Sequence, residues 1–218
     1  GQDYVFTRRL DDRLLGREHE LGIHVISPFH EHAGNEMLLR AQAMGRDDLL
    51  VILPPSDRLV RDLLMVKRTE KYIRQNISIA KPETVQRILH DKAFNNQERQ
   101  RGLGKLVEEL LQQAKLVVNG QEIEASSGDG KARVTQGFHA LLARAYPNLR
   151  MLRGVPYTSG DIGACLQSSA GFLGDDAATF SEAEQEMLAF VQGNQRNGLR
   201  TPMQSVVNTF ERKPYGWY

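Results

Sequence analysis

The sequence has little cysteine and no long apolar run. Cys165 is the single cysteine among 218 residues, so no disulfide can form within the chain, and this usage fits a reducing compartment. No apolar stretch approaches the roughly 18 residues that indicate a membrane span. The net charge of +1 excludes a global field that would attract nucleic acid or anionic lipid, but it does not exclude local charged patches. We therefore expect a cytoplasmic protein without a membrane segment.

Nucleotide-binding loops are also missing. The sequence contains neither Gly-x-x-x-x-Gly-Lys-Ser/Thr nor Gly-x-Gly-x-x-Gly, the two glycine-rich arrangements that hold phosphates. Residues 126–131 read Ser-Ser-Gly-Asp-Gly-Lys, but their spacing differs from that of a phosphate loop, and they follow a hairpin signal instead of a buried strand. We predict no nucleotide-binding residue, no catalytic residue and no cofactor within this sequence.

Three histidines lie close together in the sequence, at His24, His30 and His32, with Glu31 between the last two. Two imidazoles and a carboxylate can bind zinc. However, His-x-His in a loop lacks the helical two-histidine spacing of a zinc hydrolase, and no second ligand cluster is visible. We therefore favour a solvated loop or a core histidine, and we predict no metal site.

Cys165 is the other candidate nucleophile. It lies between Ile162 and Leu166, on a predicted inward face of a helix. A free cysteine in such a place is usually a small buried apolar residue. A free-standing enzyme that uses these histidines or Cys165 is therefore the least favoured function.

The first part of the sequence alternates β-rich runs with helical stretches. Residues 4–15 predict a strand, a turn and its return, and residues 23–27 predict another strand. The continuous apolar run over 49–53 is typical of a strand that is buried on both faces. Because this run leads into a strong helix after Ser56, it predicts an α/β unit.

A helical arm is predicted next. Lys81-Pro82 opens a helix, because proline is accepted at the first helical position. Gly102 and Gly104 are expected to break or bend this helix. Its second half should lie along a partner helix, because apolar residues recur there at spacings of three and four. These residues are Leu103, Leu106, Val107, Leu110, Leu111 and Ala114.

Asn119-Gly120 predicts the turn of a β-hairpin over 117–124. The glycine-rich stretch 126–130 that follows is the best candidate for a boundary between domains. Beyond it the sequence is helical in character. Ser181 and Glu184 form a capping box.

Thr201-Pro202 has the same helix-starting pattern, with proline at the first helical position. The helix that follows should turn four apolar residues inward. These are Met203, Val206, Val207 and Phe210.

The predicted fold class is α+β and predominantly helical. It comprises a small α/β part at 1–80 and a helical arm with a β-hairpin at 81–128. A helical C-terminal module at 129–218, similar to an incomplete winged helix, completes the division into domains.

Two stretches carry an excess of positive charge. Residues 57–74 include six basic and three acidic residues, and residues 196–213 include four basic and one acidic residue, so each has a local charge of +3. Phosphate contacts need only such local charge, although a solvated helix face is the favoured interpretation. The candidate DNA contacts are Arg58, Arg61, Lys67, Lys71, Arg74, Arg196, Arg200, Arg212 and Lys213.

The last residues predict an aromatic turn. Pro214 cannot continue the preceding helix, and Gly216, between Tyr215 and Trp217, has access to conformations that other residues avoid. We predict that these four residues form a structural anchor, with the Trp217 ring packed on the helix of Phe210. Such a turn should lead into a further element, so we interpret the sequence as a fragment of a larger protein.

The segment Phe210 to Trp217 resembles the BrxC family, the large P-loop ATPases of bacterial BREX phage-defence systems, and its PglY relatives. In those proteins a helix runs into a Pro-Tyr-Gly-Trp turn. Residues 49–76 are similar to the same family in their apolar strand, proline break and long charged helix with Tyr72 near its end. The resemblance implies that ATP and magnesium bind upstream of Gly1, because no Walker residue is present here.

We expect a non-catalytic scaffolding or partner-binding region of a phage-defence ATPase, with other subunits of the complex as partners. The main alternative is a module that binds double-stranded DNA within the same machine. The sequence leaves homo-oligomer formation open. It supports no enzymatic activity for this stretch, whereas the resemblance implies ATPase activity for the whole protein.

Overall fold

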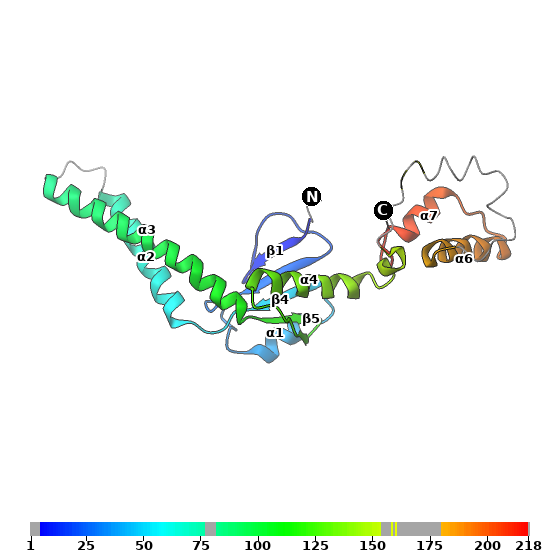
Figure 1. Ribbon diagram of the computed structural model, residues 1–218, viewed down its shortest axis with the longest axis horizontal. Helices are drawn as coiled ribbons and strands as arrows, with labels where there is room; N and C mark the ends of the chain where they lie inside the picture. Colours follow the sequence, from blue (N-terminus) through cyan, green and yellow to red (C-terminus); the bar gives the residue numbers. More distant parts are fainter. Residues whose placement is uncertain (1–4, 77–81, 154–157, 159, 161–179, 218) are drawn as a thin grey trace. The chain divides into compact units, whose positions relative to one another are not determined.

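The computed structural model describes residues 5–76, 82–153, 158, 160 and 180–217. The fold is α+β and predominantly helical, as the sequence predicted (Figure 1). The chain divides into two compact units, residues 1–141 and residues 142–218. The first unit holds a mixed sheet with a helical arm, and the second holds helices and the aromatic turn.

The sheet of the first unit has the strand order β2-β1-β3-β4-β5-β6. β1, β3 and β4 are parallel, whereas β2, β5 and β6 pair with their neighbours in antiparallel fashion. The strands span Thr7–Leu10 (β1), Arg13–Leu14 (β2), Gly22–Ile26 (β3), Asp48–Ile52 (β4), Lys115–Val118 (β5) and Gln121–Ile123 (β6). The predicted strands and the predicted hairpin therefore join in one sheet.

β4 lies at the centre of the core and is buried on both faces, as its apolar run predicted. Leu49 and Val51 are fully buried on one face, and Leu50 is buried on the other. Helix α1 (Glu36–Gln42) contributes Leu39 to the cluster that contains Leu50. This face of the sheet is therefore the one that α1 covers.

Helix α4 (Gly130–Ala145) covers the opposite face of the sheet (Figure 1). Gly137 makes this close approach possible, because a Cβ atom there would lie 3.0 Å from a methyl group of Leu49 and 3.2 Å from one of Leu116. The rings of Phe6 and Phe138 pack beside this contact, with centroids 5.3 Å apart.

Ion pairs tie α1 to the β5–β6 hairpin. Glu36 accepts a hydrogen bond from Lys115 Nζ at 2.6 Å, and Arg40 bonds to both Glu36 and Glu122. The hydrogen bond from Lys115 holds the pKa of Glu36 below its ordinary value. The helix thus carries complementary charges at the edge where it meets the sheet.

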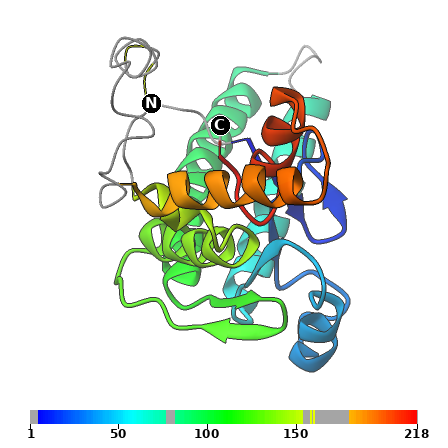
Figure 2. The ribbon, with the colours of Figure 1, turned by 90° about the vertical axis from the view of Figure 1, so that its right-hand side faces the viewer.

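The turn between β5 and β6 has the conformation that Asn-Gly favours. Asn119 and Gly120 have φ angles of 50° and 77°, which is typical of a type I′ turn. The Asn119 Oδ1 atom accepts a hydrogen bond from the Gly45 backbone at 2.7 Å. The hairpin is thereby fixed to the segment after α1, with β6 at the edge of the sheet (Figure 2).

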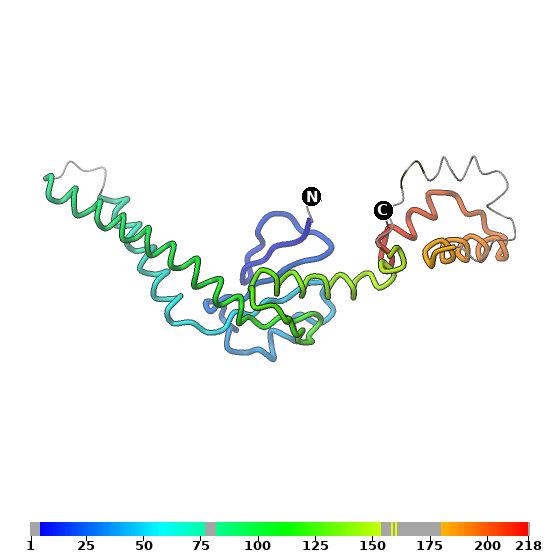
Figure 3. The backbone as a smooth tube through the Cα atoms, in the orientation of Figure 1, coloured from blue at the N-terminus to red at the C-terminus, as the bar shows by residue number. Residues whose placement is uncertain are grey.

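The helical arm lies between β4 and β5 in the sequence. It consists of α2 (Asp57–Asn76) and α3 (Glu83–Gln112), which run side by side in opposite directions (Figures 1 and 3). Ser56 caps the first helix, because its hydroxyl oxygen accepts a hydrogen bond from the Leu59 backbone at 3.2 Å. Both helices of the arm were predicted.

The predicted break at Gly102 and Gly104 is wrong, because α3 is one continuous helix of 30 residues. A glycine weakens a helix by only about 1 kcal/mol relative to alanine. Both glycines face open space, whereas Leu106 and Leu110 are buried close by. Burial of these leucines offsets the cost of the glycines.

The described residues of the second unit contain the short helix η1 (Leu149–Leu152), α6 (Glu182–Arg196) and α7 (Met203–Phe210). The predicted capping box is confirmed, because Ser181 and Glu184 exchange hydrogen bonds at the start of α6. No strand occurs among the described residues of this unit, so they include no wing of a winged helix.

Two details of the α7 prediction are wrong. Pro202 occupies the capping position itself, and Thr201 does not cap the helix. Phe210 is buried and Val206 packs beside it, but Met203 and Val207 are exposed. A helix of eight residues presents only a narrow inward stripe to a single aromatic cluster, so half of the apolar residues stay outside it.

The compact units divide the chain at a different place from the predicted boundaries of 1–80, 81–128 and 129–218. The physical reason is strand pairing. β5 bonds to β4 along its length, which joins the hairpin to the first part of the chain. α4 then packs on the same sheet and carries the first unit past the glycine-rich joint to Leu141.

Candidate interaction surfaces

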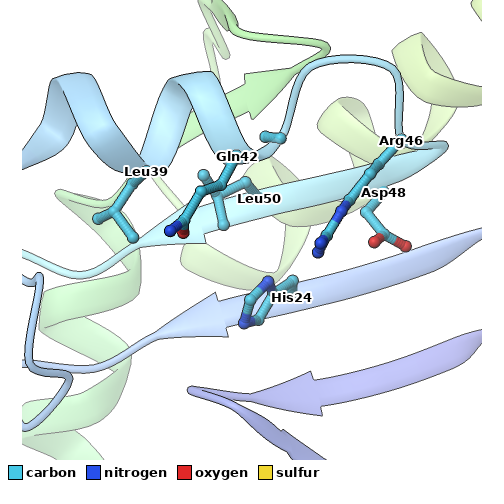
Figure 4. Close-up of a pocket in the computed structure, with 7 residues that line it drawn as sticks. His24, Leu39, Gln42, Arg46, Asp48 and Leu50 are labelled. Carbon is cyan, nitrogen blue, oxygen red and sulfur yellow. The ribbon is translucent and has the colours of Figure 1, made fainter.

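A small hollow lies between α1 and the sheet (Figure 4). Its lining comprises His24, Leu39, Gln42, Ala43, Arg46, Asp48 and Leu50. Its cavity volume is about 20 Å³, which is room for about one water molecule. Ligand pockets enclose roughly 300–1,000 Å³ and bury most of the ligand. This hollow therefore suits water or a small ion better than a nucleotide.

Two polar groups that line this hollow, His24 and Asp48, bond to residues outside it. His24 hydrogen-bonds through Nε2 to the Asp11 backbone carbonyl, and burial holds the pKa of His24 below its ordinary value of 6.5. Asp48 lies 3.7 Å from the guanidinium of Arg9 on the neighbouring part of the sheet. These contacts connect neighbouring strands and are structural in character.

The other two candidate histidines are paired near the end of β3. His30 is buried with its Nε2 atom 3.4 Å from Asp12 Oδ1, and His32 lies 3.1 Å from Glu31. Among the residues that the structure describes, no group of three histidine, cysteine, aspartate or glutamate side chains is placed to hold a metal ion. Cys165 lies outside the described residues.

The arm helices pack along a seam that repeats every seven residues, with alternate spacings of three and four, as in an antiparallel coiled coil. The seam positions on α2 are Leu59, Leu63, Val66, Glu70 and Ile73, and those on α3 are Val85, Leu89, Lys92, Asn96, Arg99, Leu103, Leu106 and Leu110. Its buried members include Leu59, Val66, Leu89 and Asn96. The charged positions Glu70, Lys92 and Arg99 interrupt the apolar pattern of the seam. For this reason the sequence alone does not reveal this part of the seam as an apolar stripe.

One hydrogen bond fixes how the two helices face each other. The side chain of Asn96 donates to the Val66 backbone carbonyl, which places Leu89 opposite Ile73 and Leu103 opposite Leu59. Leu106 and Leu110 therefore lie beyond the start of α2, toward the sheet. Both are buried, whereas Leu103, Val107 and Leu111 are partly buried, so the stripe predicted for the second half of the arm is buried in part, and its last residues do not lie along α2.

One flank of the arm is basic and has a single carboxylate, that of Glu70, at its border with the seam. We call basic flank the positions Lys67, Lys71 and Arg74 on α2 together with Gln86, His90, Gln97 and Gln100 on α3, all of which are exposed. Helical spacing places them on one side of the seam, with Arg61 and Arg68 at its outer border. By helical spacing, Glu70 is the one acidic residue that reaches this side within the described stretches 60–74 and 86–104. Glu70, in the seam, lies 3.4 Å from Lys67 and 3.3 Å from Arg74.

The opposite flank is acidic and apolar. We call acidic–apolar flank the positions Asp62, Met65 and Tyr72 on α2 with Ile88, Asp91 and Glu98 on α3. Its apolar members are well exposed: Met65 at 46 %, Tyr72 at 57 % and Ile88 at 55 %. The predictions from the sequence missed this surface, because its residues combine only when the two helices are aligned.

The structure brings together only some of the candidate DNA contacts. Lys67, Lys71 and Arg74 share the basic flank, with Arg61 at its border. Arg58 lies on the other side of α2, 3.7 Å from Asp62. The candidates of the second unit belong to separate elements: Arg196 ends α6, Arg200 lies in the segment before α7, and Arg212 and Lys213 follow that helix.

The aromatic turn is packed against α7. The Trp217 ring stacks on Phe210 with centroids 4.9 Å apart and an interplanar angle of 8°, and Tyr215 contacts both rings. The Tyr215 hydroxyl donates to Glu186 at 2.7 Å, which raises the pKa of Tyr215. Trp217 Nε1 donates to the Asn148 carbonyl at 3.2 Å. The predicted packing of Trp217 on the helix of Phe210 is thus confirmed.

The fold and one family comparison agree on the class of protein. Residues 1–141 match the family model described as BREX ATP-binding protein BrxC 4th domain with six-stranded beta sheet. This match covers well over half of the 218 residues and coincides with the first compact unit. The chain therefore belongs to the BREX BrxC family, and the match includes the strand and helix of residues 49–76 on which part of the resemblance rested. No solved structure matches the chain.

The described helices also answer the question of a membrane segment. None of them combines the length and apolar character that crossing a bilayer requires.

Proposed function

We propose that this region is a non-catalytic partner-binding part of a BREX BrxC protein, and that the α2–α3 arm is its docking element. The acidic–apolar flank is the observation that carries the proposal. Fully burying a large apolar side chain contributes about 1.5–3 kcal/mol, and Met65, Tyr72 and Ile88 are each about half exposed. Aromatic and aliphatic anchors rimmed by polar residues are typical of interaction sites.

The charge of this flank indicates the chemistry of its partner. Asp62 and Glu98, which pair with Arg58 and Arg101, lie beside the apolar residues together with Asp91. A fitting surface therefore presents apolar side chains rimmed by lysine or arginine that can replace these two cations. We assign this surface to another subunit of the BREX complex in the cytoplasm. In a symmetric dimer formed through this flank, the carboxylates of one copy would face the same carboxylates of the other. Their repulsion disfavours such a dimer.

The rest of the first unit supports a non-catalytic role. Its hollow under α1 is small, and two of its polar groups, His24 and Asp48, are engaged with Asp11 and Arg9, whereas an active site needs convergent titratable groups around a substrate. We expect no ATP hydrolysis by this chain with magnesium present. Phosphate release above that of a blank, retained after repeated purification, would contradict this expectation.

The docking proposal can be tested with purified subunits of the same BREX system, offered one at a time to immobilised chain in a binding assay. One subunit should bind, and the double variant Tyr72→Ala/Ile88→Ala should weaken that binding by about tenfold or more, because anchor truncations often cost at least 1–2 kcal/mol each. The control is Leu64→Ala/Phe94→Ala, which removes two apolar residues that are 47 % and 63 % exposed on other faces of the arm.

Equal loss in both double variants would contradict the proposal, as would the absence of binding to every subunit. Sedimentation of the free chain provides the remaining comparison. A dimer that dissociates in Tyr72→Ala/Ile88→Ala but not in the control would show that the flank binds a second copy, which would overturn the assignment to another subunit.

A further inference from the structure

The basic flank of the arm presents a row of cations that the docking proposal does not use. Lys67, Lys71 and Arg74 recur every three or four residues on α2, and Arg61 and Arg68 extend the row along its outer border. From Arg61 to Arg74 the row covers about 20 Å of helix at 1.5 Å per residue. This length spans several phosphates of a nucleic-acid strand.

The facing positions of α3 complement this row. Gln86, His90, Gln97 and Gln100 are exposed and carry no negative charge, and amide groups donate hydrogen bonds to phosphate oxygens. The arm's acidic residues near this level, Asp91 and Glu98, belong to the opposite flank. The arm therefore separates its charges, although its α3 helix alone has equal numbers of acidic and basic residues.

We propose that the basic flank binds the phosphate backbone of double-stranded DNA without reading its sequence. Binding of single strands usually adds aromatic side chains on which bases stack. The flank has no aromatic residue apart from His90, since Tyr72 lies on the acidic–apolar flank and Phe94 occupies an outward position of α3. Cations and amides without a stacking surface match a duplex, whose bases are already stacked and whose phosphates are outermost.

Glu70 moderates this surface. Its carboxylate lies 3.4 Å from Lys67 Nζ and 3.3 Å from an Arg74 guanidinium nitrogen. Each of these cations must therefore exchange a carboxylate for a phosphate when DNA binds. Replacing Glu70 by glutamine keeps the size of the side chain and removes the competing charge. The flank should then bind DNA more tightly.

This inference does not depend on the docking proposal, because it uses the opposite side of the arm. The experiment is fluorescence anisotropy with a duplex of about 25 base pairs, titrated with the purified chain at a series of salt concentrations. Neutralising Z phosphates gives a slope of about −0.9Z in a plot of log affinity against log salt. We expect a slope of about −3 to −4 for the unmodified chain, corresponding to roughly four contacts.

Two charge-matched variants separate the flank from a general charge effect. Lys67→Gln/Lys71→Gln/Arg74→Gln should weaken binding at least about tenfold at low salt and reduce the slope by about 3, one for each lost phosphate contact. Arg58→Gln/Arg101→Gln/Lys105→Gln removes three cations from other sides of the arm and should change affinity less than about twofold. Glu70→Gln should raise affinity several-fold.

Helix content measured by circular dichroism should be the same in all variants, because every substituted cation is exposed. Equal weakening by the two triple variants would overturn the proposal. So would a single strand or a linear polyphosphate that binds as tightly as the duplex, since either would show a polyanion site with no preference for duplex DNA. A flat salt dependence would overturn it as well.

Discussion

Asn96 and Val66 are joined across the two helices of the arm, with the Asn96 amide nitrogen 3.2 Å from the Val66 carbonyl oxygen. Asn96 is only 5 % exposed, and its Oδ1 atom has no hydrogen-bond partner. A buried polar group without a partner costs about 1–3 kcal/mol. In coiled coils a single buried asparagine fixes register at the expense of stability, and we interpret Asn96 in this way.

Replacing Asn96 with leucine should therefore stabilise the arm by about 1–2 kcal/mol, because the orphaned oxygen is removed and the seam gains an apolar contact. Hydrogen exchange of the α2 and α3 amides measures this locally. The control is Asn95→Leu, which changes an exposed neighbour outside the seam and should alter protection little. Lower protection in Asn96→Leu would show that its hydrogen bond outweighs the unpaired oxygen.

Leu110→Ala should destabilise the first unit by about 2–5 kcal/mol, because it leaves a cavity around a side chain that is 6 % exposed. Denaturation by urea measures the change in the free energy of unfolding. Phe94→Ala, on the same helix but exposed, should change it by less than about 0.5 kcal/mol. A similarly small effect of Leu110→Ala would mean that the C-terminal end of α3 does not pack on the rest of the first unit in solution.

Alanine substitutions at Gly216 and Gly198 can separate the cost of a strained backbone from the cost of a steric clash. Both have positive φ angles, 66° and 71°, but only at Gly216 would a Cβ atom lie 2.7 Å from the Tyr146 ring. Gly198→Ala should cost about 1–2 kcal/mol from strain alone. Gly216→Ala should cost clearly more and loosen the contacts of Trp217. Equal losses of thermal stability in the two variants would contradict a steric role for Tyr146.

The first unit should lose stability as the solution becomes acidic. Burial lowers the pKa of His24 in the folded state below its ordinary 6.5. The unfolded chain therefore binds a proton at this histidine first, and stability falls as pH drops below about 6.5. His24→Gln, which can still donate to the Asp11 carbonyl, should flatten the dependence of melting temperature on pH between about 5 and 7.5. A slope in His24→Gln equal to that of the unmodified chain would contradict this assignment.

The sheet could be predicted largely because its signals are local. The continuous apolar run Leu49 to Leu53 is explained by a strand with both faces covered. The dipeptide Asn119-Gly120 favours a hairpin turn through the conformation of its own two residues. The capping box of Ser181 and Glu184 is equally self-contained. Each of these features depends on residues that are neighbours along the chain.

The arm surfaces could not be predicted in the same way, because they depend on the alignment of two helices. Asn96 in a polar stretch gives no sign that it is buried until Val66 is placed opposite. The exposure of Met203 and Val207 has a related cause, since an apolar residue at helical spacing is buried only if something lies over it. The family resemblance pointed to the arm and the tail but not to their faces.

The arm leaves the sheet and returns to it at two residues that are paired across neighbouring strands. Ile52 and Lys115 are direct partners across β4 and β5, so the whole stretch between them leaves the sheet and returns to the same place. Because the seam repeats every seven residues, removing seven residues from each helix would shorten the arm by about 10 Å and keep every remaining layer in register. We therefore expect that the length of the arm can change without altering the sheet that supports it.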